Sequence, residues 1–499
     1  MKKHLIYFAK GLLLVTIIVL IALRVNKIML PKYYFNGKWP TTSGFKGFYE
    51  MPENSIDVFF LGSSHAVSQF IPQEIYNEYN IKSYNLGCEQ QNLLTSYYWL
   101  NEALSYQKPE YVVLDTYMCF EYKAYEPLNT SEACTRKAFD SMKWSKNKCK
   151  AVKDICSHDS NQLITSYYMT NIRYHTRWTK LIEDDFSFEE MENHYELKGY
   201  APLSDYVNNK RYKPYNKGAD SFEESPMVPL MEEYLEKITD LCKENNIELL
   251  LVKTPTTEFD INKSATVSDF AKAHNLEFID FNEEEYYNAI NFDFRYDMHD
   301  NGHGNLWGAK KISSYVGKVL HDKYGESDSN SSDIWSSTND YYIQVCDDCS
   351  IKHISDIGNY LEVLNKDDYT YFITAMGDVS EVVKKINKKY KDAFDPELKL
   401  NKIKDDISYY AISDKGNITA NQSDEQLLYH GAIRNGILDY EIMSASNKTG
   451  DSCYIKIDNV QHAVKKEGLN IVIYNNDTMK VVDSVCFMLD DNNKLKISR

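Results

Sequence analysis

The chain has 499 residues, which is more than one ordinary domain contains, so two or more domains are expected. Its formal net charge of −17 would repel nucleic-acid phosphates over most of the surface, which excludes a general nucleic-acid-binding role. The 40 tyrosines beside only 12 prolines are typical of a globular protein and exclude a disordered polymer.

The N-terminus carries a candidate membrane anchor. Residues 1–4, with Lys2 and Lys3, precede an apolar stretch over 5–24 that is long enough to cross a bilayer. No small-residue cleavage motif follows it, which predicts an uncleaved signal anchor with residues 1–4 in the cytoplasm. We therefore expect a single-pass protein of the cell membrane, attached to the membrane through this helix. Residues 25–55 would form a juxtamembrane connector, and the larger part of the chain would be extracellular. A helix buried in a globular core is the alternative.

From residue 56 onward, short apolar runs alternate with segments of helical periodicity. The predicted strands are 56–61, 83–86, 111–115, 248–253 and 276–280, and the predicted helices are 90–107, 227–244, 264–274 and 306–323. This order predicts an α/β domain over 56–324, with a parallel sheet and helices on both of its faces. A Tyr- and Lys-rich insertion at 120–225 interrupts the alternation, and it is interpreted either as a substrate wall or as a helical excursion on the surface.

A second globular unit is predicted over 336–499, after a polar linker at 325–335. It contains a predicted strand at 369–375, an amphipathic helix at 379–390, and a hairpin formed by 469–474 and 481–487. The ten cysteines are irregularly spaced and define no disulfide framework. The spacing of Cys346 and Cys349 favours a disulfide or free thiols over a zinc site, because no second pair accompanies it.

Two loops together supply the parts of a nucleophilic serine system. Ser64 ends a Gly-Ser-Ser turn directly after the first strand, and Asp300 and His303 lie in a loop beyond the fifth strand. A serine nucleophile needs a base, and the base needs an orienting carboxylate. We therefore assign Ser64 as nucleophile, His303 as general base and Asp300 as its partner, with the backbone N–H groups of Ser64 and Gly87 as oxyanion donors. This chemistry requires no cofactor and no metal.

Neighbouring residues offer alternatives to this assignment. Ser63 could be the nucleophile, and Asp297 with His299 repeats the pairing of an acid and a histidine. His65 is interpreted as a helix-start or packing residue, because only His303 has a carboxylate at suitable spacing. A metal site is a further alternative, and its donors would be Asp293, Asp297, His299, Asp300 and His303.

Three sequence blocks resemble those of GDSL/SGNH hydrolases. They are Leu61-Gly62-Ser63-Ser64, Asn85-Leu86-Gly87, and the segment from Asp300 through His303 and Asn305 to Gly308-Ala309. With its N-terminal anchor, the chain is most similar to the membrane-anchored acyl-transfer branch, such as the D-alanyl-transfer protein of teichoic acid modification and the alginate O-acetylation proteins. The resemblance implies a three-layer α/β/α domain. It also implies a serine acyltransferase or esterase acting on a cell-surface polysaccharide or teichoic-acid-like glycan. A transferase would receive its acyl group from a polytopic membrane acyltransferase.

One block departs from that family, which usually carries Gly-x-Asn after the third strand. Residues 114–120 contain no Asn that could donate to the oxyanion. The departure keeps open a second reading, a catalytically inactive SGNH-like protein that binds glycan at the cell surface. Residues 468–487, with 366–375 as an earlier strand, resemble the interleukin-like EMT inducer domain, which implies an α+β accessory domain that holds carbohydrate. A plain structural β-rich domain is the alternative.

Overall fold

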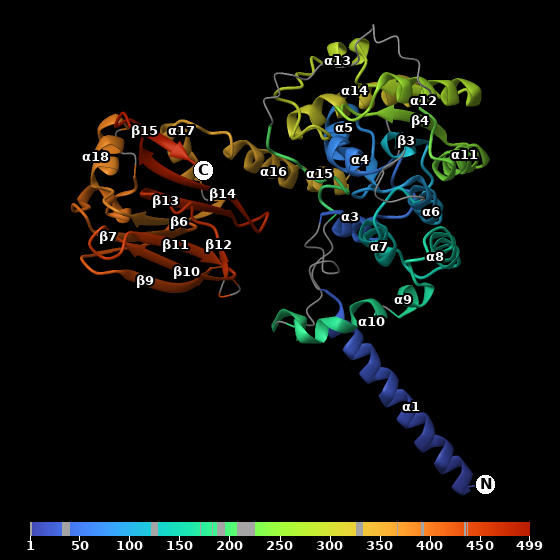
Figure 1. Cartoon of the computed structure of the whole chain (residues 1–499), viewed down its shortest axis with the longest axis horizontal. Helices are drawn as coiled ribbons and strands as arrows, with labels where there is room; N and C mark the ends of the chain where they lie inside the picture. Colours follow the sequence, from blue (N-terminus) through green and yellow to red (C-terminus); the bar gives the residue numbers. More distant parts are fainter. Residues whose placement is uncertain are drawn as a thin grey trace. The chain divides into compact units, whose positions relative to one another are not determined.

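The protein is described by a computed structural model that covers most of the chain. The described residues are 2–31, 40–120, 128–169, 171–181, 183–186, 195–206, 225–325, 333–366, 368–390, 394–433, 436 and 438–499. They form two compact units, residues 1–339 and residues 340–499, which are coloured blue to yellow and orange to red in Figure 1. The predicted connector, insertion and linker each lie partly outside the described residues.

The core of unit 1 is a parallel five-stranded sheet, as the sequence predicts. Its strands are β1 (Val58–Leu61), β2 (Ser83–Asn85), β3 (Tyr111–Asp115), β4 (Glu248–Lys253) and β5 (Glu277–Asp280). The strand order is β2-β1-β3-β4-β5, and every pairing is parallel. The chain therefore changes direction across the sheet between β1 and β3. Open α/β sheets bind ligands at the carboxyl ends of the strands at such a point.

Alternate residues along the strands pack into two separate apolar clusters. Phe59 and Val112 belong to one cluster, and Phe60 and Val113 belong to the other. The first cluster includes side chains of α3 (Pro40–Phe48), α6 (Leu93–Ala103), α7 (Glu132–Ser141), α8 (Lys146–His158), α11 (Pro229–Glu244), α12 (Ile261–His274) and α15 (Asp333–Ser337). The second includes side chains of α4 (Ser64–Gln69), α5 (Pro72–Tyr79), α13 (Glu284–Ala289) and α14 (Leu306–Tyr324). Strands of a parallel sheet read as continuous apolar runs because both of their faces are covered.

Two predicted boundaries differ from the structure. The segment expected to be an irregular connector contains α3, whose Phe45 is buried and stacks on Trp99 with ring centroids 4.3 Å apart. The stretch expected to be a linker ends inside α15, whose Trp335 is buried in the core of unit 1. In both segments a few aromatic side chains attach a polar stretch to the core, and such isolated residues give no periodic signal.

The N-terminal helix α1 (Lys2–Met29) is the one helix among the described residues that is long and apolar enough to cross a membrane. Its side chains are exposed along most of its length, and Met29 at its end is buried against unit 1.

A buried lysine joins the end of the insertion to the last helix of unit 1. The Lys198 ammonium donates hydrogen bonds to Gln73 Oε1 at 2.9 Å and to Thr338 Oγ1 at 2.5 Å, and it lies over the Trp335 ring. Burial lowers the pKa of Lys198 from 10.5 to about 7. In the native state this group therefore loses its proton near neutral pH, whereas the unfolded chain keeps it until about pH 10.5.

This difference predicts that unit 1 becomes more stable as the pH rises above 7. Between pH 7 and 9 the unfolded chain binds more protons at this position, so Lys198 should add roughly 2–3 kcal/mol to the free energy of unfolding. Denaturant unfolding of the full-length protein at both pH values should show this rise, and Lys198→Met should flatten it. The exposed Lys272 provides the control, because Lys272→Met should leave the pH dependence unchanged. Equal pH slopes in wild type and Lys198→Met would contradict the assignment.

Unit 2 contains a ten-stranded sheet. Its strands are β6 (Tyr369–Met376), β7 (Ser408–Asp414), β8 (Asn417–Ser423), β9 (Leu427–Ile433), β10 (Leu438–Ala445), β11 (Ser452–Ile457), β12 (Val460–Gln461), β13 (Gly468–Asn475), β14 (Lys480–Leu489) and β15 (Leu495–Ser498). Its helices include α16 (Asn339–Ile351), whose first residue belongs to unit 1, α17 (Ile357–Leu364) and α18 (Ser380–Lys389). The predicted strand, helix and hairpin correspond to β6, α18 and the antiparallel pair β13–β14. All ten cysteines of the chain are free thiols, Cys346 and Cys349 on α16 among them.

Candidate active site

The turn after β1 presents Ser64 at the start of a short helix. Gly62 has a φ of +140°, and a Cβ there would lie only 2.9 Å from the Cβ of Asp115, so this position requires glycine. Ser63 caps α4 by accepting a hydrogen bond from the N–H of His65. Ser64 is the first residue of the helix and is half-buried at the carboxyl end of β1.

Ser64, His303 and Asp300 are joined by consecutive hydrogen bonds, as the positions of their two loops predict. Ser64 Oγ is 2.8 Å from His303 Nε2, and His303 Nδ1 is 2.9 Å and 3.0 Å from the two carboxylate oxygens of Asp300. Because a carboxylate only accepts, Nδ1 carries the proton, and Nε2 can accept the proton of Ser64. The serine and the histidine are 239 residues apart in the chain, so the tertiary fold alone brings them together.

The loop holds Asp300 as an ionised carboxylate. Asp300 Oδ1 accepts hydrogen bonds from the N–H of Gly302 at 2.7 Å and from the N–H of His303 at 2.8 Å. Partial burial acts to raise the pKa of Asp300, but the charge of His303 and these hydrogen bonds outweigh it, so the pKa lies below its usual value. The carboxylate can therefore orient the imidazole and stabilise an imidazolium.

The alternative residues have other contacts. Ser63 is buried and caps α4. Asp297 accepts from Lys311 Nζ at 2.6 Å and from the N–H of Asp293, and His299 Nδ1 accepts from the N–H of Asp205 at 3.2 Å. Among the described residues, no group of three or more His, Cys, Asp or Glu side chains could hold a metal ion.

The two oxyanion donors named from the sequence have different surroundings. The N–H of Ser64 lies in the first turn of α4, where backbone N–H groups have no partner within the helix. Gly87 lies against the same turn, since a Cβ there would be 3.0 Å from the carbonyl oxygen of Gly62. Its N–H, however, donates to Asn85 Oδ1 at 3.0 Å. Gly87 can serve an oxyanion only if that hydrogen bond is exchanged.

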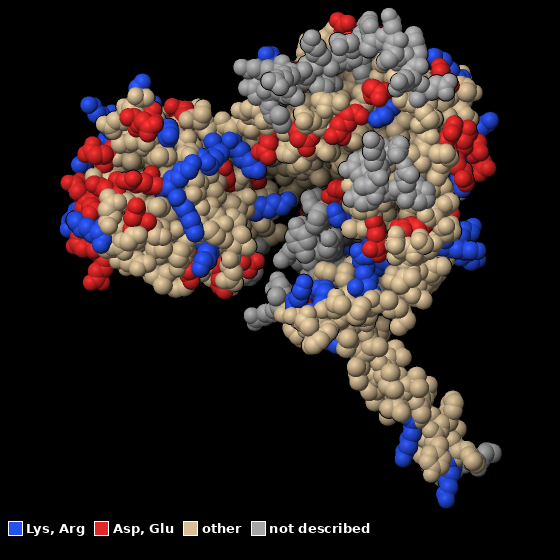
Figure 2. Space-filling model, viewed as in Figure 1, with Lys and Arg blue, Asp and Glu red and all other residues tan. Residues whose placement is uncertain are grey.

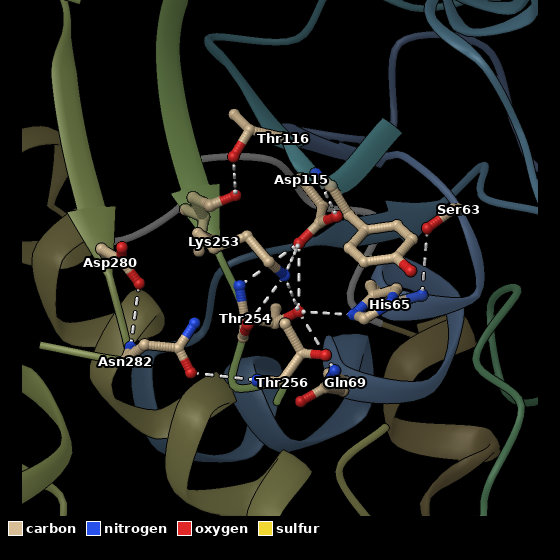
Figure 3. A network of polar contacts seen from close by, with 12 residues as sticks. Ser63, His65, Gln69, Asp115, Thr116, Lys253, Thr254, Thr256, Asp280 and Asn282 are labelled. Carbon is tan, nitrogen blue, oxygen red and sulfur yellow. Dashed lines mark hydrogen bonds and ion pairs between the residues drawn. The ribbon is translucent and has the colours of Figure 1, made fainter. Parts of the chain in front are cut away.

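A buried polar network lies at the ends of β3 and β4 and is drawn in Figure 3. At the ends of neighbouring strands, Lys253 Nζ is 3.5 Å from Asp115 Oδ2, and both side chains are fully buried. Thr254 links the pair to α4, because its hydroxyl donates to Asp115 Oδ2 at 3.0 Å and accepts from Gln69 Nε2 at 3.1 Å. Burial lowers the pKa of Lys253, against the opposing charges of Asp115 and Asp280.

The sequence analysis did not identify this network, although a signal for it exists. Asp115 and Lys253 each end a run of apolar residues, and a parallel sheet brings such ends to one edge. A single charged residue after a buried strand is usually solvated. Only the pairing of β3 with β4 shows that Asp115 and Lys253 lie side by side and form a buried ion pair.

His65 packs against His303. Its ring stacks on Tyr117 with centroids 3.9 Å apart, and its centroid is 4.9 Å from that of His303. Burial, together with the charges of Lys253 and His303, lowers the pKa of His65 well below its ordinary value. A neutral imidazole therefore supports the face of His303, which agrees with the packing role predicted for His65.

The last described part of the insertion, residues 195–206, lies beside the site. The N–H of Asn85 donates to the carbonyl of Lys198, and the N–H of Ala201 donates to the carbonyl of Val67 on α4. The N–H of Leu306 donates to the carbonyl of Leu203, just after the histidine loop. This segment therefore borders the loops that carry Ser64 and His303, which is where a substrate wall would lie.

No protein-family model matches this chain, and no curated protein matches its sequence. A serine hydroxyl, an imidazole with a defined tautomer and an ionised carboxylate can together form and break an ester bond.

Proposed function

We propose that this protein is a membrane-anchored, extracellular serine acyltransferase or esterase that acts on acyl esters of a cell-surface glycan. The observation that carries the proposal is the pair of hydrogen bonds that joins Ser64 to His303 and His303 to Asp300. Its supports are the position of Ser64 at the carboxyl edge of a parallel sheet, the apolar helix α1, and the resemblance of three sequence blocks to SGNH hydrolases. On this reading, unit 1 is a three-layer SGNH-like domain.

The reaction would proceed through an acyl-enzyme. Ser64 Oγ attacks the carbonyl carbon of the ester, and its proton moves to His303 Nε2. The alcohol of the donor leaves with that proton, and the acyl group stays on Ser64. An acceptor hydroxyl, from water or from a sugar, then gives its proton to His303 and displaces Ser64, which takes the proton back. Asp300 keeps its charge throughout.

The remaining parts of the chain would serve delivery and binding. A transferase needs a donor at the outer membrane face, which a polytopic membrane acyltransferase would supply. Unit 2 would be an accessory domain that holds polysaccharide or a teichoic-acid-like polymer near the site. No cofactor takes part in this scheme.

Labelling of the purified full-length protein with a fluorophosphonate probe tests the proposal. The probe reacts with a serine only when a base activates it, so wild type should be labelled and Ser64→Ala should not. Ser63→Ala is the matched control, since it removes a hydroxyl one residue away and should cost about 1 kcal/mol of helix capping without loss of label. Label that persists in Ser64→Ala would contradict the assignment.

A second candidate function is a glycan-binding protein without catalysis. The hydrogen bond between Gly87 N–H and Asn85 Oδ1 favours it, because that bond occupies one of the two oxyanion donors. Absence of labelling from acid to alkaline pH, with saccharide binding retained, would establish this function instead. For a labelled protein, an acyl donor offered with water or with sugar acceptors separates esterase from transferase by the product formed.

A further inference from the structure

The end of unit 1 from which α1 emerges carries most of that unit's exposed apolar side chains. Outside α1, eleven large apolar side chains are exposed in the described part of unit 1, and eight of them lie between residues 144 and 186. Monomeric soluble proteins rarely gather exposed apolar groups in one patch without a partner for it. We therefore expect a partner that covers these exposed apolar side chains.

Four short elements carry the patch: α9 (Ile164–Tyr168), α10 (Asn171–Tyr174), η2 (His175–Thr179) and η3 (Glu183–Phe186). We call it the collar and define it by the exposed side chains of Ile164, Tyr168, Met169, Ile172, Trp178 and Phe186. Trp178 is 71% exposed and Met169 is 62% exposed, so neither is part of the core of unit 1. Trp144 adjoins the collar by stacking on Tyr168.

The collar lies beside the end of α1, where that helix joins the rest of unit 1. Residues of α10, η2 and η3 pack against α1. Arg177, next to Trp178, donates a hydrogen bond to the carbonyl of Met29 at 2.8 Å and forms two hydrogen bonds with the buried carboxylate of Asp185. Figure 2 shows mostly uncharged surface at this end of unit 1, where the helix leaves it. The end of α1 is thus fixed against the collar.

The length of α1 places the collar at the level of lipid headgroups. Residues 5–23 span roughly 28 Å as a helix, close to the hydrocarbon thickness of a bilayer. The six residues from Arg24 to Met29 add about 9 Å, which is comparable to one headgroup layer. Aromatic side chains are enriched at this depth in membrane proteins because their rings are apolar and their polar atoms remain wet.

We propose that the collar is seated in the outer interface of the bilayer that α1 spans. The proposal rests on the membrane location proposed for α1. Two attachments, the spanning helix and the collar, would then hold unit 1 at a fixed orientation to the membrane, where a helix alone would act as a tether. The occupant is lipid, whose interface matches a patch of exposed Trp, Tyr, Ile, Met and Phe side chains.

Quenching of tryptophan fluorescence by brominated lipid tests the proposal. The full-length protein would be reconstituted in phosphatidylcholine vesicles with brominated acyl chains, and α1 contributes no signal because it contains no tryptophan. Because Trp144 adjoins the collar, the test is made in a Trp144→Phe background: that variant should be quenched, and adding Trp178→Phe should remove most of the quenching. Trp307→Phe, on α14, is the matched control and should keep it. Phe186→Trp in the background that carries both Trp144→Phe and Trp178→Phe should restore the quenching.

The outcomes separate this proposal from the one on which it rests. If alkaline carbonate releases the chain from vesicles, α1 is not embedded, and both proposals fail. If the chain resists carbonate but Trp178 is not quenched, the anchor stands and the collar proposal is overturned. Trp178 that is unquenched in pure lipid but protected in native membranes would identify a membrane protein as the occupant, which also overturns it.

Discussion

Replacement of Asp300 by Asn should lower the rate of ester cleavage roughly 10⁴-fold while leaving the fold intact. The amide oxygen can keep the hydrogen bonds that Gly302 and His303 donate to Oδ1, which places the NH₂ group at the Oδ2 position, 3.0 Å from His303 Nδ1, where it competes with the oxygen 2.9 Å from Nδ1. An N–H donor at that position favours the tautomer with its proton on Nε2, and such an imidazole cannot accept the proton of Ser64. Hydrolysis of p-nitrophenyl acetate by the full-length protein provides the measurement.

The control for this variant is a second carboxylate of the same region. Asp293 is paired with Arg295 on the surface and has no contact with His303, so Asp293→Asn should keep activity within about twofold. Melting curves of both variants should match wild type. Undiminished turnover in Asp300→Asn would mean that the carboxylate does not set the tautomer, and the triad assignment would then be withdrawn.

The second large expected effect is a loss of stability when the buried ion pair of Lys253 and Asp115 is broken. Lys253→Met should lower the free energy of unfolding by roughly 3–5 kcal/mol, because it leaves the Asp115 carboxylate buried without its cation. Asp115→Asn should cost a comparable amount, since the ammonium then loses its closest anion. Denaturant unfolding of the full-length protein in detergent measures both changes.

Combining the two replacements should recover much of the loss. In the double variant neither charge remains, the Asn oxygen can accept from the N–H of Tyr117, and the Asn NH₂ group can donate to the hydroxyl oxygen of Thr254. The exposed pair Lys272–Asp269 is the matched comparison, and its double-mutant cycle should give less than about 1 kcal/mol of coupling energy. Additive losses at Lys253 and Asp115 would show that the two side chains are not electrostatically coupled.

The parts of the fold that the sequence predicts are those with a strong local pattern. The run Val58–Leu61 is apolar throughout because β1 is covered on both faces, and the helix over 306–323 has one apolar face. Strands β8 and β9 gave no comparable signal. They alternate exposed and partly buried residues, including polar ones such as Asn421 and His430, so local composition does not distinguish them from loops.

In the candidate site, too, some residues could be predicted from the sequence and others could not. Ser64 and His303 were found because each lies in a short block with its own turn chemistry, and Asp300 lies three residues from its partner. The network of Lys253, Asp115 and Thr254 was missed, because its members become neighbours only when β3 pairs with β4. Burial, which decides whether a lysine is a surface group or half of an ion pair, is a property of the tertiary structure.

Gly304 lies directly after His303, and its α-carbon lies against the amide side chain of Gln69 on α4. A methyl group at this position would come within 2.6 Å of Gln69 Oε1. The contact between Gly304 and Gln69 therefore helps to set the distance between Ser64 and His303, although neither of those two residues takes part in it. The alignment of Ser64 Oγ with His303 Nε2 thus depends on how closely α4 and the turn that contains Gly304 approach each other.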